Sequence, residues 1–389
     1  MNKNIGYSYL FLLIAPLLLI TSAHLFQVVF PIHSNYNATS YIFISILDVF
    51  LSVFALFLIL ISSGKNNNNR LIEIFVKRLK NKSATLFSIT TALFIILLPS
   101  IIASSAQVLS GCGRDCLVMS ADGVSGILYF LFVGMATLLV SYFFVFHVDY
   151  KKTILLFVFL VSSLIITASR AELVFTILFT LWAYFLTLSM TGSIKAIPIR
   201  KISGSLVLIL VFFAALFQYY IQRRGAEINL LRTIFEFFSY RASSLHLGAY
   251  LIESQQVNFF HAIFVYPFDY LVGVFWDPNQ RLMTTEFYHN FPLLGEDHLG
   301  LDYRSNVVYP WWSWFYASMG PVGIIIKFMF IYSLLYVFFK LRLLYFFIYF
   351  SYSFLIGAQT GHPMASIVGP ITITILIFME ITSRLCFKK

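Results

Sequence analysis

The residues best suited to bind an anion are arginines that adjoin long apolar runs. Arg170 stands between two such runs. Arg223 and Arg224 directly follow a third run, and Arg241 lies shortly after them. A guanidinium group binds phosphate or carboxylate through two parallel hydrogen bonds, whereas the lysine ammonium group acts as a point charge. Because a charge at the depth of a bilayer is costly and marks a functional candidate, these arginines predict a site for an anionic ligand.

Each of these arginines also has a purely structural interpretation. Arg170 could form an ion pair with the nearby Glu172, or extend its side chain to the lipid headgroups. Arg223 and Arg224 could anchor the end of a span at the membrane interface. The sequence leaves both interpretations open.

Groups that could transfer a proton follow in the same part of the chain. Their spacing does not indicate which of them share one cavity, and a structural role remains the alternative for each. They are His246, Glu253, His261, Asp269, Asp277, Glu286, His289, Glu296, Asp297 and His298, together with His362 in the short loop Gly361-His362-Pro363.

The elements that must position these groups are transmembrane helices. Hydrophobic residues make up 60% of the 389 residues and charged residues 11%, whereas a soluble domain carries about 25% charged residues. A spanning helix needs about 20 mostly apolar residues and satisfies its own backbone groups. We expect an all-α, polytopic bundle of about ten spans. The apolar runs are 7–30, 41–62, 84–106, 124–147, 153–169, 171–190, 204–222, 318–339, 343–361 and 364–383.

Basic residues orient these spans. If the spans alternate, one side carries Lys3, Lys65, Arg70, Lys77, Arg78, Lys80, Lys82, Lys151, Lys152, Lys195, Arg200, Lys201, Lys340, Arg342, Arg384, Lys388 and Lys389. By the positive-inside rule this side is the cytoplasm, and it holds both termini. The other side carries only arginines: Arg114, Arg170, Arg223, Arg224, Arg232, Arg241, Arg281 and Arg304. The rule does not distinguish lysine from arginine, so this bias again indicates an anionic ligand, although a packing preference would also explain it.

One long segment separates the spans. We interpret 222–319 as a large extracytoplasmic loop within a single integral membrane domain, 1–389. Apolar pieces at 230–250 and 259–275 predict short helices at the membrane face. On the cytoplasmic side, the basic amphipathic stretch 72–79 predicts a helix on anionic lipid.

Three tryptophans, Trp311, Trp312 and Trp314, precede the next span. Such a cluster is typical of an interfacial aromatic belt and could also stack on sugar rings.

Several classes of function lack their residues. The chain contains no nucleotide-binding, hydrolase, zinc-protease or kinase signature. Three cysteines do not make a disulfide scaffold, although Cys112 and Cys116 could form one small disulfide or stay free thiols. Two cysteines alone are a poor metal site, so we expect neither metal nor cofactor. The positive-inside rule accounts for the formal net charge of +10, so we expect no nucleic-acid partner. Asp48 and Lys327 are the clear charges inside spans, which is thin support for a transport path.

Taken together, the spans, Ser169-Arg170 at an outer helix junction, Gln222-Arg223-Arg224-Gly225 opening one large outer loop, and the re-entry at Gly320-Pro321-Val322-Gly323 follow a familiar pattern. In this architecture the chain resembles the bacterial O-antigen (oligosaccharide repeat unit) polymerases of the Wzy type, a family held together by topology and scattered arginines.

The resemblance implies a metal-independent, GT-C-like glycosyltransferase of lipopolysaccharide biosynthesis in the inner membrane. Such enzymes join repeat units carried on undecaprenyl pyrophosphate, and the family implies a chain-length regulator as a partner. On this interpretation Arg170, Arg223, Arg224 and Arg241 hold the pyrophosphate. The catalytic base would be one of His246, Glu253 and His362. The alternatives are an O-antigen ligase of the same architecture, a non-enzymatic flippase or transporter of the lipid-linked unit, and a structural membrane scaffold.

Overall fold

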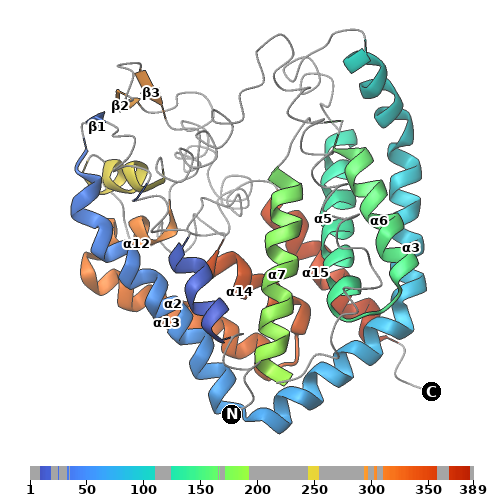
Figure 1. Cartoon of the computed structure of the whole chain (residues 1–389), viewed down its shortest axis with the longest axis horizontal. Helices are drawn as coiled ribbons and strands as arrows, with labels where there is room; N and C mark the ends of the chain where they lie inside the picture. Colours follow the sequence, from blue (N-terminus) through green and yellow to red (C-terminus); the bar gives the residue numbers. More distant parts are fainter. Residues whose placement is uncertain are drawn as a thin grey trace. The chain divides into compact units, whose positions relative to one another are not determined.

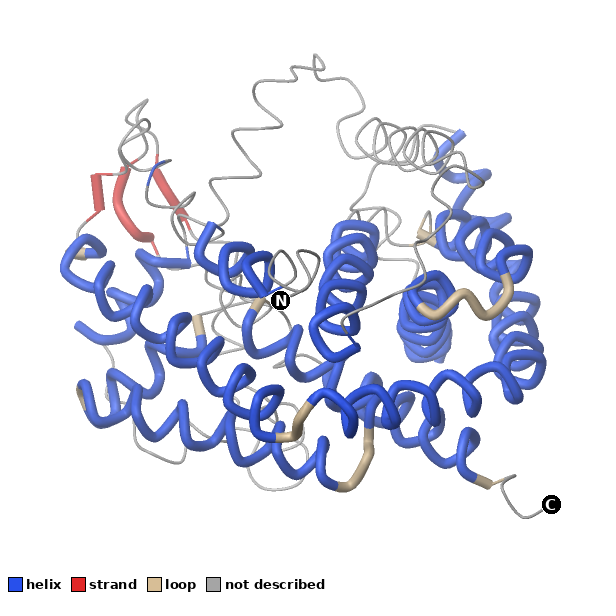
Figure 2. The backbone as a smooth tube through the Cα atoms, turned by 60° about the horizontal axis from the view of Figure 1, so that its bottom comes forward, coloured by secondary structure: helices blue, strands red, loops and turns tan. Residues whose placement is uncertain are grey.

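The computed structural model describes residues 9–18, 25, 33–34, 36–109, 124–164, 166, 171–191, 244–253, 293–296, 302–304, 310–356 and 368–385. Within these ranges most of the chain is helical (Figure 2). Four helical stretches there are long and apolar enough to cross a membrane: Ala38–Ser62, Lys65–Gln107, Gly126–Val145 and Pro321–Lys340. Three shorter apolar helices accompany them: Tyr9–Leu18, Phe175–Thr191 and Leu344–Leu355. The chain is thus a multi-pass helical membrane protein, as its composition predicts.

The backbone divides into two compact units. The first consists of Met1–Ile5, Lys65–Asn229 and Ile371–Lys389. The second consists of Gly6–Gly64 and Leu230–Pro370.

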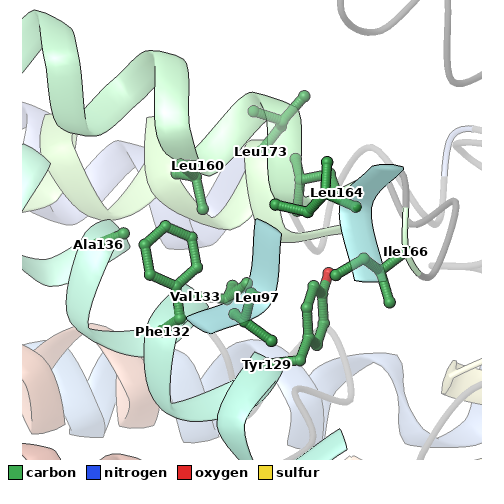
Figure 3. Close-up of a cluster of buried hydrophobic side chains, with 10 residues drawn as sticks. Leu97, Tyr129, Phe132, Val133, Ala136, Leu160, Leu164, Ile166 and Leu173 are labelled. Atoms are coloured by element: carbon green, nitrogen blue, oxygen red, sulfur yellow. The ribbon is translucent and has the colours of Figure 1, made fainter. Parts of the chain in front are cut away.

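In the first unit, four helices pack on one another. They are α3 (Lys65–Leu109), α5 (Val124–Val145), α6 (Tyr150–Ser163) and α7 (Ala171–Thr191), labelled in Figure 1. Their shared apolar core includes Leu97 of α3, Phe132 of α5 and Leu160 of α6, and Figure 3 shows these side chains directed toward one another. Phe94 stacks on Phe159 with ring centroids 4.1 Å apart. Packing of this kind is the main source of helix association inside lipid, where both the helices and the solvent are apolar.

A polar seam joins α5 to α7. The hydroxyl groups of Thr137 and Thr176 lie 3.1 Å apart, and those of Ser141 and Thr180 lie 2.8 Å apart. Each pair lets two hydroxyls satisfy one another away from water.

The basic stretch predicted to lie on lipid is the first part of α3. Its apolar face, with Leu71, Phe75 and Leu79, is buried. The Phe75 ring contacts the rings of Tyr142 in α5 and Phe146 just after α5, with ring centroids 5.9 Å and 5.1 Å away. The apolar stripe is therefore covered by protein, and the contact of the basic residues with anionic lipid stays a prediction.

In the second unit, α2 (Ile42–Ser62) and α13 (Pro321–Lys340) run in the same direction. Asp48 meets Lys327, and Phe54 further along α2 meets Phe328, with ring centroids 6.3 Å apart. Parallel packing agrees with an alternating topology in which both helices cross in the same sense.

A sharp corner leads into α13 from α12 (Trp311–Met319). Gly320 adopts φ 60°, a conformation that disfavours residues with a side chain. A Cβ atom placed on Gly323 would lie 1.9 Å from the backbone oxygen of Phe315, so only glycine fits this crossing. After α13 the chain turns into α14 (Leu344–Leu355), and the last described helix is α15 (Val368–Arg384).

A small antiparallel sheet was not predicted. β2 (Leu293–Glu296) pairs with β1 (His33–Ser34) on one side and β3 (Asp302–Arg304) on the other, and the strands are red in Figure 2. It joins the residues before α2 to the long loop, for which we expected short helices alone. Strands of two to four residues are too short to leave an alternating pattern in the sequence.

Some expected spans are longer than the helices observed, and others lie outside the described residues. α6 ends at Ser163 and α14 at Leu355, earlier than the apolar runs 153–169 and 343–361 suggest. The expected span 204–222 lies outside the described residues, so the total of about ten spans stays a prediction.

Candidate functional site

Four tyrosines and one carboxylate gather in the second unit, where α2 begins. The Tyr36 and Tyr250 rings meet edge to face, with centroids 4.9 Å apart and planes at 82°. Tyr41 and Tyr316 meet in the same manner at 5.9 Å and 73°. Glu253 is exposed beside them, with its carboxylate near the Tyr41 phenol. We call these five residues the tyrosine–carboxylate cluster.

Glu253 ends a helical segment, 244–253, whose residues up to Leu251 are almost all buried. Leu245, Ala249 and Ile252 follow the spacing of a single helix face. This face packs into a buried cluster with Ala38, Trp312 and Ile324.

Close approach makes this docking specific. A Cβ atom on Gly248 would lie 2.9 Å from a ring atom of Trp312 and 3.2 Å from Cγ of Pro310. The segment can therefore lie against the start of α12 only because residue 248 has no side chain.

The electrostatics of the cluster favour protonated phenols. Burial raises the pKa of Tyr36, and the neighbouring Tyr250 and Glu253 raise it further. At neutral pH Tyr36 therefore keeps its proton and can donate a hydrogen bond. An exposed carboxylate next to phenol groups can accept a proton from a bound hydroxyl, while the ring faces offer an apolar surface beside it.

Two of the three predicted catalytic bases lie on one helical segment and differ in exposure. His246 and Glu253 lie on the same helical segment, two turns apart. His246 is only 5% exposed, whereas Glu253 is exposed. Of the two, Glu253 is the group that a substrate hydroxyl can reach. Arg170, Arg223, Arg224, Arg241 and His362 lie outside the described residues, so their assignments stay predictions.

The three tryptophans are buried, which fits neither of their two predicted roles. Trp311, Trp312 and Trp314 are 0%, 1% and 3% exposed. All three side chains are covered by the elements packed around α12. Their burial argues against both an exposed interfacial belt and a sugar-stacking surface.

Inside the second unit, the two span-interior charges bind each other. Nζ of Lys327 lies 2.6 Å and 2.7 Å from the two carboxylate oxygens of Asp48. The Lys327 and Asp48 side chains are 0% and 2% exposed. Nζ also lies 5.0 Å from the centre of the Trp311 ring, in a cation–π arrangement. Two opposite charges at matching depth in two spans are a signal from which this pair could have been predicted, because a charge in lipid needs a partner.

The tyrosine–carboxylate cluster gave no such signal. The chain contains 23 tyrosines, and nothing in their spacing distinguishes these four. Among the described residues, no group of three or more His, Cys, Asp and Glu side chains could hold a metal ion.

Comparison with known proteins finds no family model, no curated protein and no solved structure that matches the chain.

Proposed function

We propose that this chain is an O-antigen polymerase. It is a metal-independent glycosyltransferase that joins undecaprenyl-pyrophosphate-linked oligosaccharide repeat units. The reaction takes place at the outer face of the bacterial inner membrane, in lipopolysaccharide biosynthesis. The chain crosses this membrane several times and keeps both termini in the cytoplasm.

The observation that carries the proposal is the tyrosine–carboxylate cluster. It lies just before α2, on the segment 244–253 and in α12, whereas the basic Lys340 lies at the far end of α13. In the proposed topology the cluster faces the extracytoplasmic side, and the positive-inside rule supports this orientation. A sugar offers apolar ring faces and polar hydroxyl edges, which suit tyrosine rings and a carboxylate respectively.

The reaction assigns each group a role. Glu253 accepts the proton from a hydroxyl of the acceptor sugar, whose oxygen then attacks the anomeric carbon of the donor. The bond from that carbon to the phosphate oxygen breaks, and undecaprenyl pyrophosphate leaves with the electron pair. Arg170, Arg223, Arg224 and Arg241 stabilise the charge of the leaving pyrophosphate. His246 and His362 are the other predicted bases.

The pairing of Asp48 with Lys327 bears on the transporter alternative. A transport path needs polar groups available to a passing substrate. These two fully buried charges instead satisfy one another, so they add no support to a transport function.

The direct test uses purified protein in lipid vesicles with an undecaprenyl-pyrophosphate-linked repeat unit from the host organism. A polymerase releases undecaprenyl pyrophosphate and produces a ladder of lengthened glycans. Transfer only onto lipid A core would indicate a ligase instead. No transfer to either acceptor, with intact protein and with a chain-length regulator added, would contradict the proposal.

The arginines are tested by substitution in the same assay. We expect Arg170→Ala, Arg223→Ala and Arg241→Ala each to shorten the ladder at unchanged protein level. Arg→Lys at these sites distinguishes an effect of charge from an effect of two-point hydrogen bonding, because lysine keeps the positive charge but not the paired donors. If all three alanine variants polymerise normally, the arginines do not hold the pyrophosphate.

A further inference from the structure

We infer that Asp48, Lys327 and Trp311 form a buried positioning device that holds α12, and through it the helical segment 244–253, in the arrangement that places Glu253 beside Tyr41. The inference rests on the proposed function only for its effect on catalysis. Its structural consequence can be measured independently.

The device connects three helices at one ammonium group. Lys327 of α13 binds both carboxylate oxygens of Asp48 on α2, at 2.6 Å and 2.7 Å. The same ammonium group lies 5.0 Å from the centre of the Trp311 ring, at the start of α12. Trp311 is also stacked on Phe354 of α14, with ring centroids 5.1 Å apart. The position of α12 is therefore coupled to that of the ion pair.

α12 transmits this position to the tyrosine–carboxylate cluster at two points. Trp312, next to Trp311, packs with Leu245 and Ala249 of the segment that carries Glu253. One turn further along α12, Tyr316 meets Tyr41, with ring centroids 5.9 Å apart. A shift of α12 would therefore displace both Glu253 and Tyr41.

Charge gives this arrangement a specificity that apolar packing does not supply. Inside a bilayer the lipid tails are as apolar as leucine, so apolar contacts alone select the register of neighbouring helices weakly. A buried ion pair is satisfied in one register, because a slip leaves an uncompensated charge in lipid. Asp48 follows the first residue of α2 by six positions, and Lys327 follows the first residue of α13 by six positions. The pair thus aligns the starts of both helices, where the cluster is built.

The experiment measures the geometry of the cluster directly. In a background with Cys112, Cys116 and Cys386 replaced by serine, Tyr36→Cys and Tyr250→Cys create a pair where the native rings are 4.9 Å apart. The rate of cross-linking by a short bifunctional thiol-reactive reagent in native membranes reports how these two segments lie. Glycan transfer is measured separately in chains that keep both tyrosines.

The first variant replaces the pair by apolar residues of similar size, Asp48→Leu with Lys327→Met. Such replacements are tolerated in protein interiors, so the chain is expected to accumulate in the membrane. We expect the cross-linking rate to fall about fivefold, and kcat to fall about tenfold with KM within twofold, because misplaced catalytic groups lower the rate of the chemical step. The matched control is Thr137→Val with Thr176→Val, which removes a buried polar pair of the first unit and is expected to change neither measurement.

A second pair of variants keeps the ion pair intact. Trp311→Phe retains a ring face for the ammonium group, and Trp311→Leu does not. We expect Phe to retain cross-linking and kcat, and Leu to lower both. If the apolar double variant does not accumulate, the two Trp311 variants decide whether the device positions α12.

The inference is overturned if the apolar double variant cross-links and turns over like the unmodified pair, or if Trp311→Leu behaves like Trp311→Phe. A chain without glycosyltransferase activity would contradict the proposed function. The cross-linking rates would still decide the positioning role.

Discussion

Tyr36 and Tyr250 meet edge to face, with ring centroids 4.9 Å apart, and so join the residues just before α2 to a helix in the long loop. The contact occurs between segments far apart in the sequence, and the exposed Glu253 lies on the same helical segment as Tyr250. This arrangement places two tyrosine rings of the tyrosine–carboxylate cluster next to its carboxylate. It leads to separate predictions for binding and for catalysis.

Removal of one ring should weaken binding of the acceptor glycan. If a tyrosine ring against a sugar contributes as much as an aromatic pair, about 0.5–1.5 kcal/mol, Tyr250→Leu raises KM for the acceptor about two- to tenfold. Tyr250→Phe keeps the ring and should change KM little. Tyr184→Leu in α7 is the matched control, because Tyr184 also makes an edge contact, to Phe185, but outside the cluster. Equal KM values for the Leu and Phe variants of Tyr250 would rule out a role for the ring face.

Substitution of Glu253 should affect the chemical step instead. Glu253→Gln keeps the size of the side chain and removes its capacity to accept a proton. Because general-base catalysis contributes about 10²- to 10⁴-fold, we expect a loss of that order in kcat with KM nearly unchanged. The control is Glu73→Gln, an exposed carboxylate on α3. Normal kcat in Glu253→Gln would move the role of base to another group, and His362→Ala would then be tested in the same assay.

The limits of the sequence are visible in these same residues. Apolar runs predict helices because lipid requires every backbone group to be satisfied locally, and the expected span 41–62 agrees with α2 within one residue. Asp48 and Lys327 lie 279 positions apart, so no local pattern joins them, and only a comparison of charge depth between two spans could have paired them. Helix periodicity reports which face is apolar, but not which distant helix covers that face.

The tyrosine–carboxylate cluster was even less predictable. Its members come from the residues before α2, the segment 244–253 and α12, and each contact depends on how these segments dock. Glu253 itself was among the predicted bases because of its residue type and its place in the loop. The rings beside it required the tertiary structure.

The corner between α12 and α13 predicts a large effect from a single methyl group. A Cβ atom at residue 323 would lie 1.9 Å from the backbone oxygen of Phe315, which cannot move without displacing α12. We expect Gly323→Ala to lower stability by about 2–4 kcal/mol, seen as a lower midpoint of thermal unfolding in detergent.

A matched control exists for this substitution in the first unit. A Cβ atom at residue 134 would lie 2.7 Å from Cδ1 of Ile375, the far end of a flexible side chain that can rotate away. Gly134→Ala should therefore cost less than about 1 kcal/mol. If both variants unfold at the same temperature, the α12–α13 corner is not constrained as its geometry indicates.

The start of α6 should depend on pH through one carboxylate. Asp149 caps the helix by accepting a hydrogen bond from the Lys152 backbone N–H at 3.2 Å, and the Lys152 ammonium group lies 3.1 Å from its other oxygen. The backbone hydrogen bond from Lys152, with its side-chain contact and charge, holds the pKa of Asp149 below the ordinary value of about 3.9. Since the folded pKa is lowered, the stabilisation is fully present above about pH 4 and is lost as the pH falls through the folded pKa.

Amide hydrogen exchange in the first turn of α6, compared between pH 3 and pH 7, tests this prediction. Protection relative to the unstructured rate should decrease at the acid end in the native chain. Asp149→Asn keeps a good capping residue that does not titrate, so its protection should not vary with pH. Asp149→Ala should lose protection at every pH, by about 1 kcal/mol. An acid-induced loss of equal size in the Asn variant would place the titrating group elsewhere.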